Sequence, residues 1–102
     1  MYLTKSADKT LCLIYKKYLT KVKSGISKQE ANRFNTFNIE NDFKNVDSDD
    51  FDNDLDELCK IKFINFDIVG NYSLTTSGII YLENRFKNGL NEVTDFIAKF
   101  IP

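Results

Sequence analysis

The chain has 102 residues, of which 42% are hydrophobic and 28% are charged, and its net charge is −1. This length suits one globular domain, and the apolar share is too high for a disordered chain. The absence of His and Trp and the presence of only two cysteines exclude most catalytic and metal-binding constellations, and the total charge favours neither nucleic acid nor a membrane.

The first third of the chain predicts two helices. Ser6 or Asp8 can cap a first helix that runs to about Lys23. Its apolar face has helical spacing and comprises Leu11, Ile14, Tyr15, Tyr18, Leu19 and Val22. Ile26 could form one short strand. Ser27 with Glu30 is a capping box, which opens a second helix that ends at about Phe34 or Asn35.

The middle of the chain predicts a loop followed by an acidic helix. Residues 36–46 show no steady period, so we interpret them as an ordered loop held to the core by Phe37, Ile39, Phe43 and Val46. Asp47 or Ser48 caps a third helix, whose single apolar stripe is Phe51, Leu55, Leu58 and Cys59. The remaining faces of this helix are polar and mostly acidic.

The last third predicts a hairpin and two further helical segments. Residues 62–68 are rich in strand formers, Gly70-Asn71 is a turn signal, and residues 72–74 form the return strand. Thr75 or Thr76 caps a fourth helix to about Asn88, with the expected core residues Ile79, Ile80, Leu82 and Phe86. Gly89 then breaks or kinks the helix, and Asn91 opens a last apolar segment.

The order helix, short strand, helix, helix, hairpin, helix is typical of a winged helix-turn-helix domain. Phe51-x3-Leu55-x2-Leu58-x5-Ile64 and the stretch Gly-Asn-Tyr-Ser-Leu-Thr-Thr-Ser-Gly-Ile-Ile-Tyr-Leu-Glu at 70–83 resemble small winged-helix proteins of the YjcQ-like type, found in Gram-positive bacteria and their phages. The resemblance covers about residues 48–85. It implies an α+β winged-helix fold and regulatory or phage-related ancestry, with no established activity. We expect one domain over residues 1–102, with a core of residues 6–75 and a C-terminal helical extension of residues 76–102. In this motif Thr caps the helix after the wing, and Gly78 lets that helix lie close against the sheet.

Charge is segregated along the chain. Residues 1–33 carry a net +6, residues 34–59 a net −8, and residues 60–102 a net +1. A helix-turn-helix inserts its recognition helix into the major groove, but the acidic third helix here opposes contact with phosphates. We therefore interpret its polar face as a candidate protein-docking face, made of Asp49, Asp52, Asn53, Asp56 and Glu57.

The basic first third of the chain keeps an alternative open, a DNA-binding regulator that contacts phosphates without reading bases. Its candidate phosphate-contacting residues are Lys16, Lys17, Lys21, Lys23, Lys28 and Arg33. The same residues also fit a solvated helix face, or a face that meets the acidic helix of another chain.

The C-terminal apolar stripe has two interpretations, packing on the first helix of the same chain or a homodimer interface. The candidate interface residues are Val93, Phe96, Ile97, Phe100 and Ile101. A third interpretation, a membrane-surface helix, is weaker than these two because the polar side offers only Lys99 against Glu92 and Asp95.

No chemistry is predicted. The alternating acids at positions 50, 52, 54 and 56 lack the Gly and Glu of a calcium loop, and no His is present to activate a hydroxyl nucleophile. We expect no catalytic residue, metal or cofactor, and no small-molecule substrate is evident. The chain shows no signal-peptide core and no apolar run of about 20 residues, which predicts a cytoplasmic protein with two buried thiols and no membrane partner. The sequence thus predicts a non-enzymatic interaction or regulatory module whose partner is another protein or a second copy.

Overall fold

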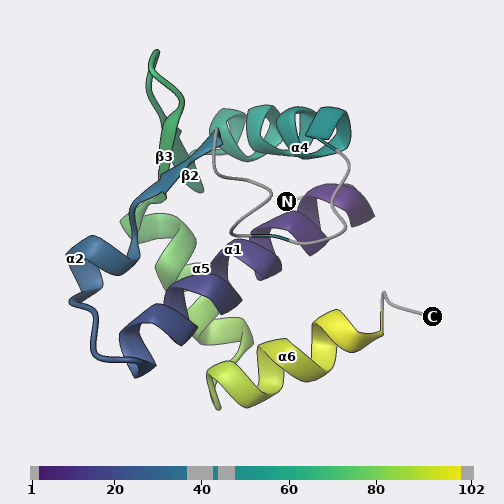
Figure 1. The fold of residues 1–102 in the computed structure, drawn as a ribbon. Coiled ribbons are helices and arrows are strands. Elements are labelled where there is room, and N and C mark those ends of the chain that lie inside the picture. Colours follow the sequence, from purple (N-terminus) through teal and green to yellow (C-terminus); the bar gives the residue numbers. More distant parts are fainter. Residues whose placement is uncertain (1–2, 37–42, 44–47, 100–102) are drawn as a thin grey trace.

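The computed structural model describes residues 3–36, 43 and 48–99, and its fold is α+β, mostly helical with a small three-stranded antiparallel sheet (Figure 1). Helix α1 packs against α4 and α6, which flank it in Figure 1, and the sheet lies at one end of α4. In chain order the elements are α1 (Lys5–Lys23), α2 (Lys28–Ala31), β1 (Phe34–Asn35), α4 (Ser48–Lys60), β2 (Ile64–Phe66), β3 (Asn71–Leu74), α5 (Thr76–Arg85) and α6 (Leu90–Ala98).

Helix α1 begins two to four residues earlier than predicted, because Thr4 rather than Ser6 or Asp8 is its N-cap. The Thr4 hydroxyl accepts a hydrogen bond from the Ala7 N–H at 3.1 Å. The predicted apolar face is confirmed in its main part, and its buried members are Leu11, Ile14, Tyr15 and Tyr18. Gly25, with φ +100°, follows the C-cap residue Ser24 and takes a backbone conformation that favours glycine.

The strand predicted at Ile26 is wrong, because this residue lies between α1 and α2 with 42% of its surface exposed and no strand beside it. Helix α2 starts as predicted, since the Ser27 hydroxyl accepts a hydrogen bond from the Glu30 N–H at 3.3 Å. It ends at Ala31, however, and the prediction that it reaches Phe34 or Asn35 is wrong, because these two residues form β1.

Asn32 explains the early end of α2. Its side-chain Nδ2 donates to the Leu74 carbonyl at 2.9 Å, and its Oδ1 accepts from the Leu74 N–H at 2.8 Å. The side-chain amide thereby forms the two hydrogen bonds to the end of β3 that a neighbouring strand would form. These bonds hold the chain that follows α2 beside the sheet.

The sheet has the strand order β1-β3-β2, so the two strands of the hairpin lie beside each other and β1 adds to β3. In the register Phe34 and Phe66 both lie opposite Tyr72, and the three rings stack in a row. This aromatic face is turned to the core, where Phe34 and Tyr72 are buried. Phe43 is also buried and contacts the Phe34 and Phe51 rings, which confirms its predicted role, whereas Phe37, Ile39 and Val46 lie outside the described residues.

Helix α5 is capped by Thr75, as predicted, through a 3.0 Å hydrogen bond from the Gly78 N–H to the Thr75 hydroxyl. It ends at Arg85, three residues before the predicted end, and α6 follows after Gly89, whose φ is +68°. Of the four core residues expected in the fourth helix, Leu82 and Phe86 are buried and Ile79 is partly buried. The prediction for Ile80 is wrong, because this side chain is 52% exposed.

Candidate functional site

The outward side of α4 is an exposed polar surface, which we call the acidic face and which consists of Asp49, Asp52, Asn53 and Asp56. Asp56 forms an i,i+4 ion pair with Lys60, with Nζ 3.2 Å from Oδ2. Both side chains are at least 70% exposed, so this pair contributes about 0–1 kcal/mol and neutralises one acid without burying it. All the residues that the sequence predicted for this face are therefore exposed, with one exception.

That exception is Glu57, which belongs to the junction between α4 and α1. Its Oε2 accepts from the Thr4 N–H at 3.0 Å and its Oε1 from the Thr4 hydroxyl at 3.1 Å. One turn away, the buried Asp54 accepts from the Ser6 and Thr10 hydroxyls at 2.7 and 2.6 Å. The structure therefore places Glu57 beside Asp54 in a carboxylate cluster that holds the start of α1, where the helix dipole also favours negative charge.

The predicted basic residues fall into two groups. Lys21 and Arg33 have contacts within the chain, since the Lys21 ammonium lies 4.2 Å from the Phe34 ring centroid and Arg33 pairs with Glu30 at 3.4 Å. The remaining four form what we call the basic face, and they have no ion pair with any described residue: Lys16, Lys17, Lys23 and Lys28.

The structure describes three of the five candidate dimer-interface residues on α6. Val93 and Ile97 are buried in the core of the same chain, because α6 packs along α1. Phe96 is partly buried, and Phe100 and Ile101 lie outside the described residues. The alternative interpretation, packing on the first helix, is the one that the structure supports.

Arg85 fixes this packing. Its guanidinium forms a bidentate ion pair with Asp8 of α1, and its Cζ lies 4.4 Å from the centroid of the Phe96 ring. The hydrogen bonds to Asp8 raise the pKa of Arg85 above its ordinary value. One side chain of α5 therefore contacts both α1 and α6.

An exposed apolar tip on the hairpin is absent from the sequence prediction. We call Phe66, Ile68 and Val69 the hairpin tip; Phe66 is 47% exposed, Val69 is 60% exposed and Ile68 is fully exposed. The hairpin projects beyond the helices at the top of Figure 1. The sequence predicted a strand over residues 62–68 from its strand formers. The position of Ile68 and Val69 directly before the Gly70-Asn71 turn signal could have pointed to side chains beyond the end of the sheet.

Asp67 shapes this tip. Its Oδ1 accepts hydrogen bonds from the Val69 and Asn71 N–H groups at 3.0 and 2.9 Å, and Gly70 takes φ +87°. These backbone N–H donors, that of Asn71 most strongly, hold the pKa of the Asp67 carboxyl below its usual value. The turn within the tip therefore has a defined conformation, with two exposed apolar side chains, Ile68 and Val69, and one carboxylate.

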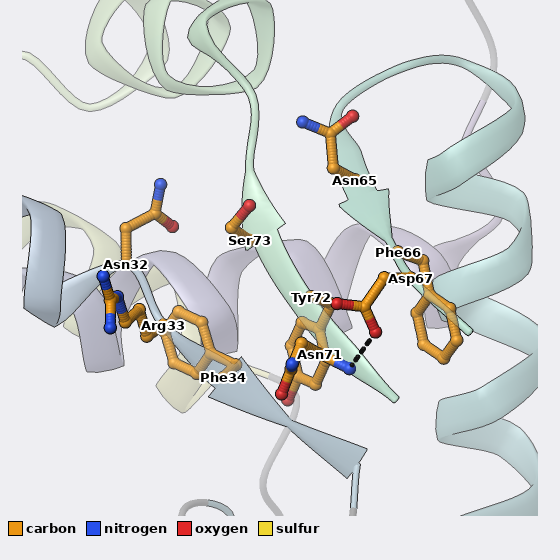
Figure 2. Close-up of a pocket in the computed structure, with 9 residues that line it drawn as sticks. All are labelled: Asn32, Arg33, Phe34, Asn65, Phe66, Asp67, Asn71, Tyr72 and Ser73. Atoms are coloured by element: carbon orange, nitrogen blue, oxygen red, sulfur yellow. Dashed lines mark hydrogen bonds between the residues drawn. The ribbon is translucent and has the colours of Figure 1, made fainter. Parts of the chain in front are cut away.

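The outer face of the sheet is polar and hollowed. Figure 2 shows Asn32, Ser73 and Asn65 side by side along this face, with Arg33 at one end and Asp67 at the other. A hollow of about 440 Å³ is lined by these residues together with Asn71, Phe34, Phe66 and Tyr72. A second hollow of about 440 Å³ shares Asn32, Arg33 and Ser73 with it and continues to Lys28. We call the two hollows together the polar groove.

The two cysteines carry no evident chemistry. Both are free thiols, and burial raises the pKa of Cys12 to about 12. Burial and the nearby Asp56 carboxylate also raise the pKa of Cys59. No group of three or more potential metal ligands occurs within residues 3–36, 43 and 48–99, and within the same residues no helix has the length and apolar character needed to cross a membrane.

Comparison of the chain with protein-family models, with curated proteins and with solved structures gives no match.

Proposed function

We propose that the chain is a non-enzymatic winged-helix protein that acts as a protein-interaction or regulatory module. The winged-helix assignment is supported by the three-stranded order β1-β3-β2 and by the hairpin between α4 and α5. In this assignment α4 takes the place of the third helix and the β2–β3 hairpin is the wing. The acidic face of α4 and the basic face of α1 and α2 are its two charged contact surfaces.

The observation that carries the proposal is the exposed hairpin tip. A fully exposed Ile68 next to a 60% exposed Val69 leaves adjacent apolar surface in water, and the hydrophobic effect favours covering such surface with a partner. Asp67 lies in the turn itself, and the acidic face lies on α4, the helix from which the chain enters the hairpin through Lys60 and Lys62. We therefore expect a partner protein with an apolar socket bordered by Lys or Arg.

The experiment replaces Ile68 by the photo-crosslinking residue p-benzoylphenylalanine in the full chain, expressed in its native cells. Because Ile68 is fully exposed, the replacement does not disturb the core. The matched control carries the same residue at Asn84, an exposed position on α5. A discrete cross-linked protein at position 68 and none at position 84 is the expected result. No adduct, or the same adducts at both positions, would refute a docking role for the tip.

A second arm tests the acidic face with the Asp52→Lys, Asp56→Lys variant. The cross-link from position 68 should then weaken, because the proposed partner is basic around its socket. Glu83→Lys with Asp95→Lys gives a control of equal charge change at exposed positions outside α4. An equal cross-link in both double variants would contradict the contribution of α4.

One observation favours a second candidate function, a DNA-binding transcriptional regulator. The four lysines of the basic face have no ion pair with any described residue, so they are available to phosphates. A mobility shift on duplex DNA at low salt, weakened in Lys16→Glu, Lys17→Glu but not in Lys87→Glu, Lys99→Glu, is the expected result for this function. No shift on any duplex at low salt would exclude it.

A further inference from the structure

The outer face of the sheet has an unusual composition for strands. Its outward positions hold Asn35, Asn65, Asn71 and Ser73, which the register places opposite one another as Asn35↔Asn71 and Asn65↔Ser73. Asn is depleted in strands, where β-branched and aromatic side chains are favoured. A solvated sheet face built for stability would carry Thr or charged residues instead. Binding sites are expected where residues depart in this way from the preference of strands for particular side chains.

Some of these side chains form hydrogen bonds within the chain, and others do not. Asn35 donates to Asn71 at 2.7 Å, and Asn32 is held by the backbone of Leu74. Asn65 and Ser73 make no side-chain hydrogen bond with any described residue and lie together in the polar groove. The groove therefore offers a donor-and-acceptor amide and a hydroxyl on a rigid sheet, between two fixed amides.

The cations of the groove lie at one end. Arg33 lines both hollows and Lys28 lines the second. Arg33 also pairs with Glu30 at 3.4 Å, but both side chains are more than half exposed, so the guanidinium retains donors for another anion. At the other end Asp67 uses its Oδ1 for the turn. A ligand that fits this distribution has one anionic end and a neutral hydrogen-bonding body.

We propose that the polar groove binds a nucleoside monophosphate, with its phosphate at Arg33 and Lys28 and its nucleoside over Asn65 and Ser73. Hollows of about 440 Å³ each match the size of small-molecule sites. Asn side chains pair with base edges because the amide carries both a donor and an acceptor. Two cations and two acids around the groove suit one phosphate and not a polymer, which needs several phosphate contacts. Phe66 of the hairpin tip and Asp67 also line the first hollow, but Ile68, the position of the cross-linking residue in the test of the proposed function, lines neither hollow. The failure of one test is therefore distinguishable from the failure of the other.

The test is an NMR titration of the ¹⁵N-labelled full chain with the four nucleoside 5′-monophosphates. We expect saturable shifts of the Asn65 side-chain NH₂, the Ser73 amide and the Arg33 amide with at least one nucleotide. The same nucleoside without phosphate, ribose 5-phosphate and inorganic phosphate should each bind more weakly. No saturable shift with any nucleotide, or a fragment that binds as tightly as the nucleotide, would overturn the proposal. Tighter binding of a single-stranded oligonucleotide would overturn it in favour of a nucleic-acid strand.

The variants separate a binding role from a structural one. In Asn65→Thr, Ser73→Thr the better strand former should hold or raise the melting temperature while nucleotide affinity falls about tenfold. Arg33→Gln should lower affinity about tenfold or more, because it removes a charge-assisted hydrogen bond. Asn84→Thr and Lys87→Gln, at exposed positions that do not line the groove, should leave affinity unchanged. Unaltered affinity in both groove variants would refute the site.

Discussion

Gly78 is the position where the fold leaves least room for a side chain. A Cβ added there would lie 2.4 Å from the Phe63 carbonyl oxygen and 3.2 Å from its carbonyl carbon. Both are backbone atoms, so they cannot rotate away as a flexible side chain would. Separations below 3.0 Å are essentially not seen for real Cβ atoms, so Gly78→Ala must move α5 away from the start of the hairpin by about 0.6 Å.

This movement strains the hydrogen bonds that join α5 to the hairpin. The Thr75 N–H donates to the Phe63 carbonyl at 3.0 Å, and the Thr75 hydroxyl donates to the Lys62 carbonyl at 2.7 Å. Two weakened hydrogen bonds represent about 2 kcal/mol, and overpacking adds about 1–3 kcal/mol. The greater helix propensity of Ala offsets about 1 kcal/mol. We expect Gly78→Ala to lower the free energy of unfolding by about 2–4 kcal/mol.

The assay is thermal and urea unfolding followed by circular dichroism. The predicted loss corresponds to a decrease in Tm of about 10–25 °C for a domain of this size. Ser77→Ala is the matched control, because this neighbouring side chain is exposed and gains helix propensity without meeting the hairpin. A Gly78→Ala variant as stable as the wild type, or more stable, would show that α5 does not approach Phe63 so closely.

Three further predictions concern other contacts. Arg85→Lys should destabilise the domain by about 1–2 kcal/mol in urea unfolding, because Lys cannot form the bidentate pair with Asp8; an unchanged midpoint would contradict this. The pKa of Asp67 is lowered in the folded chain, so its carboxylate should stabilise the hairpin fully above about pH 4 and less as the pH falls further. Amide hydrogen exchange of the hairpin, measured at several pH values, should show this loss in the wild type and not in Asp67→Asn. In the native chain at pH 8 a thiol reagent should modify the partly exposed Cys59 much faster than the buried Cys12, and equal rates would argue against the packing of α1.

The long helices could be predicted from the sequence because their faces are decided by spacing alone. Apolar residues recur at helical spacing from Leu11 to Tyr18 and lie on the buried side of α1. Those from Phe51 to Leu58 lie in the same way on the buried side of α4. The Thr75 cap was predictable for the same reason, since it joins residues three positions apart. The close approach of Gly78 is to the backbone of Phe63, a distant residue, and it was expected only from the resemblance to winged-helix proteins.

The errors occur where a distant residue overrides the local preference. Thr4 rather than Ser6 caps α1, because Glu57 binds its backbone and hydroxyl from 53 positions away. Asn32 ends α2 because its amide pairs with Leu74, which is 42 positions away. Local patterns carry no information about such partners, so the limits of short elements could not be derived from them.

The charged surfaces show the same division. The sequence alone does not distinguish among the acids of the third helix. In the structure Asp54 and Glu57 accept hydrogen bonds from the start of α1, whereas Asp52 and Asp56 are exposed to solvent. Similarly, Lys21 covers the Phe34 ring. The sequence predicted that charge would be segregated, but which charges remain for a partner depends on the packing of α1 against α4 and the sheet.

The buried carboxylates also bear on why the third helix is so acidic. Asp54 accepts two hydroxyl hydrogen bonds at 2.6 and 2.7 Å, and Glu57 supports the N-cap of α1, so these two acids are required by the fold. Asp52 and Asp56 have no such role, because both are exposed and Asp56 forms only a surface ion pair. Stability therefore does not explain Asp52 and Asp56, and a basic partner would. The exposed hairpin tip leads to the same conclusion from the hydrophobic effect, which is why the proposed contact combines an apolar tip with an acidic helix.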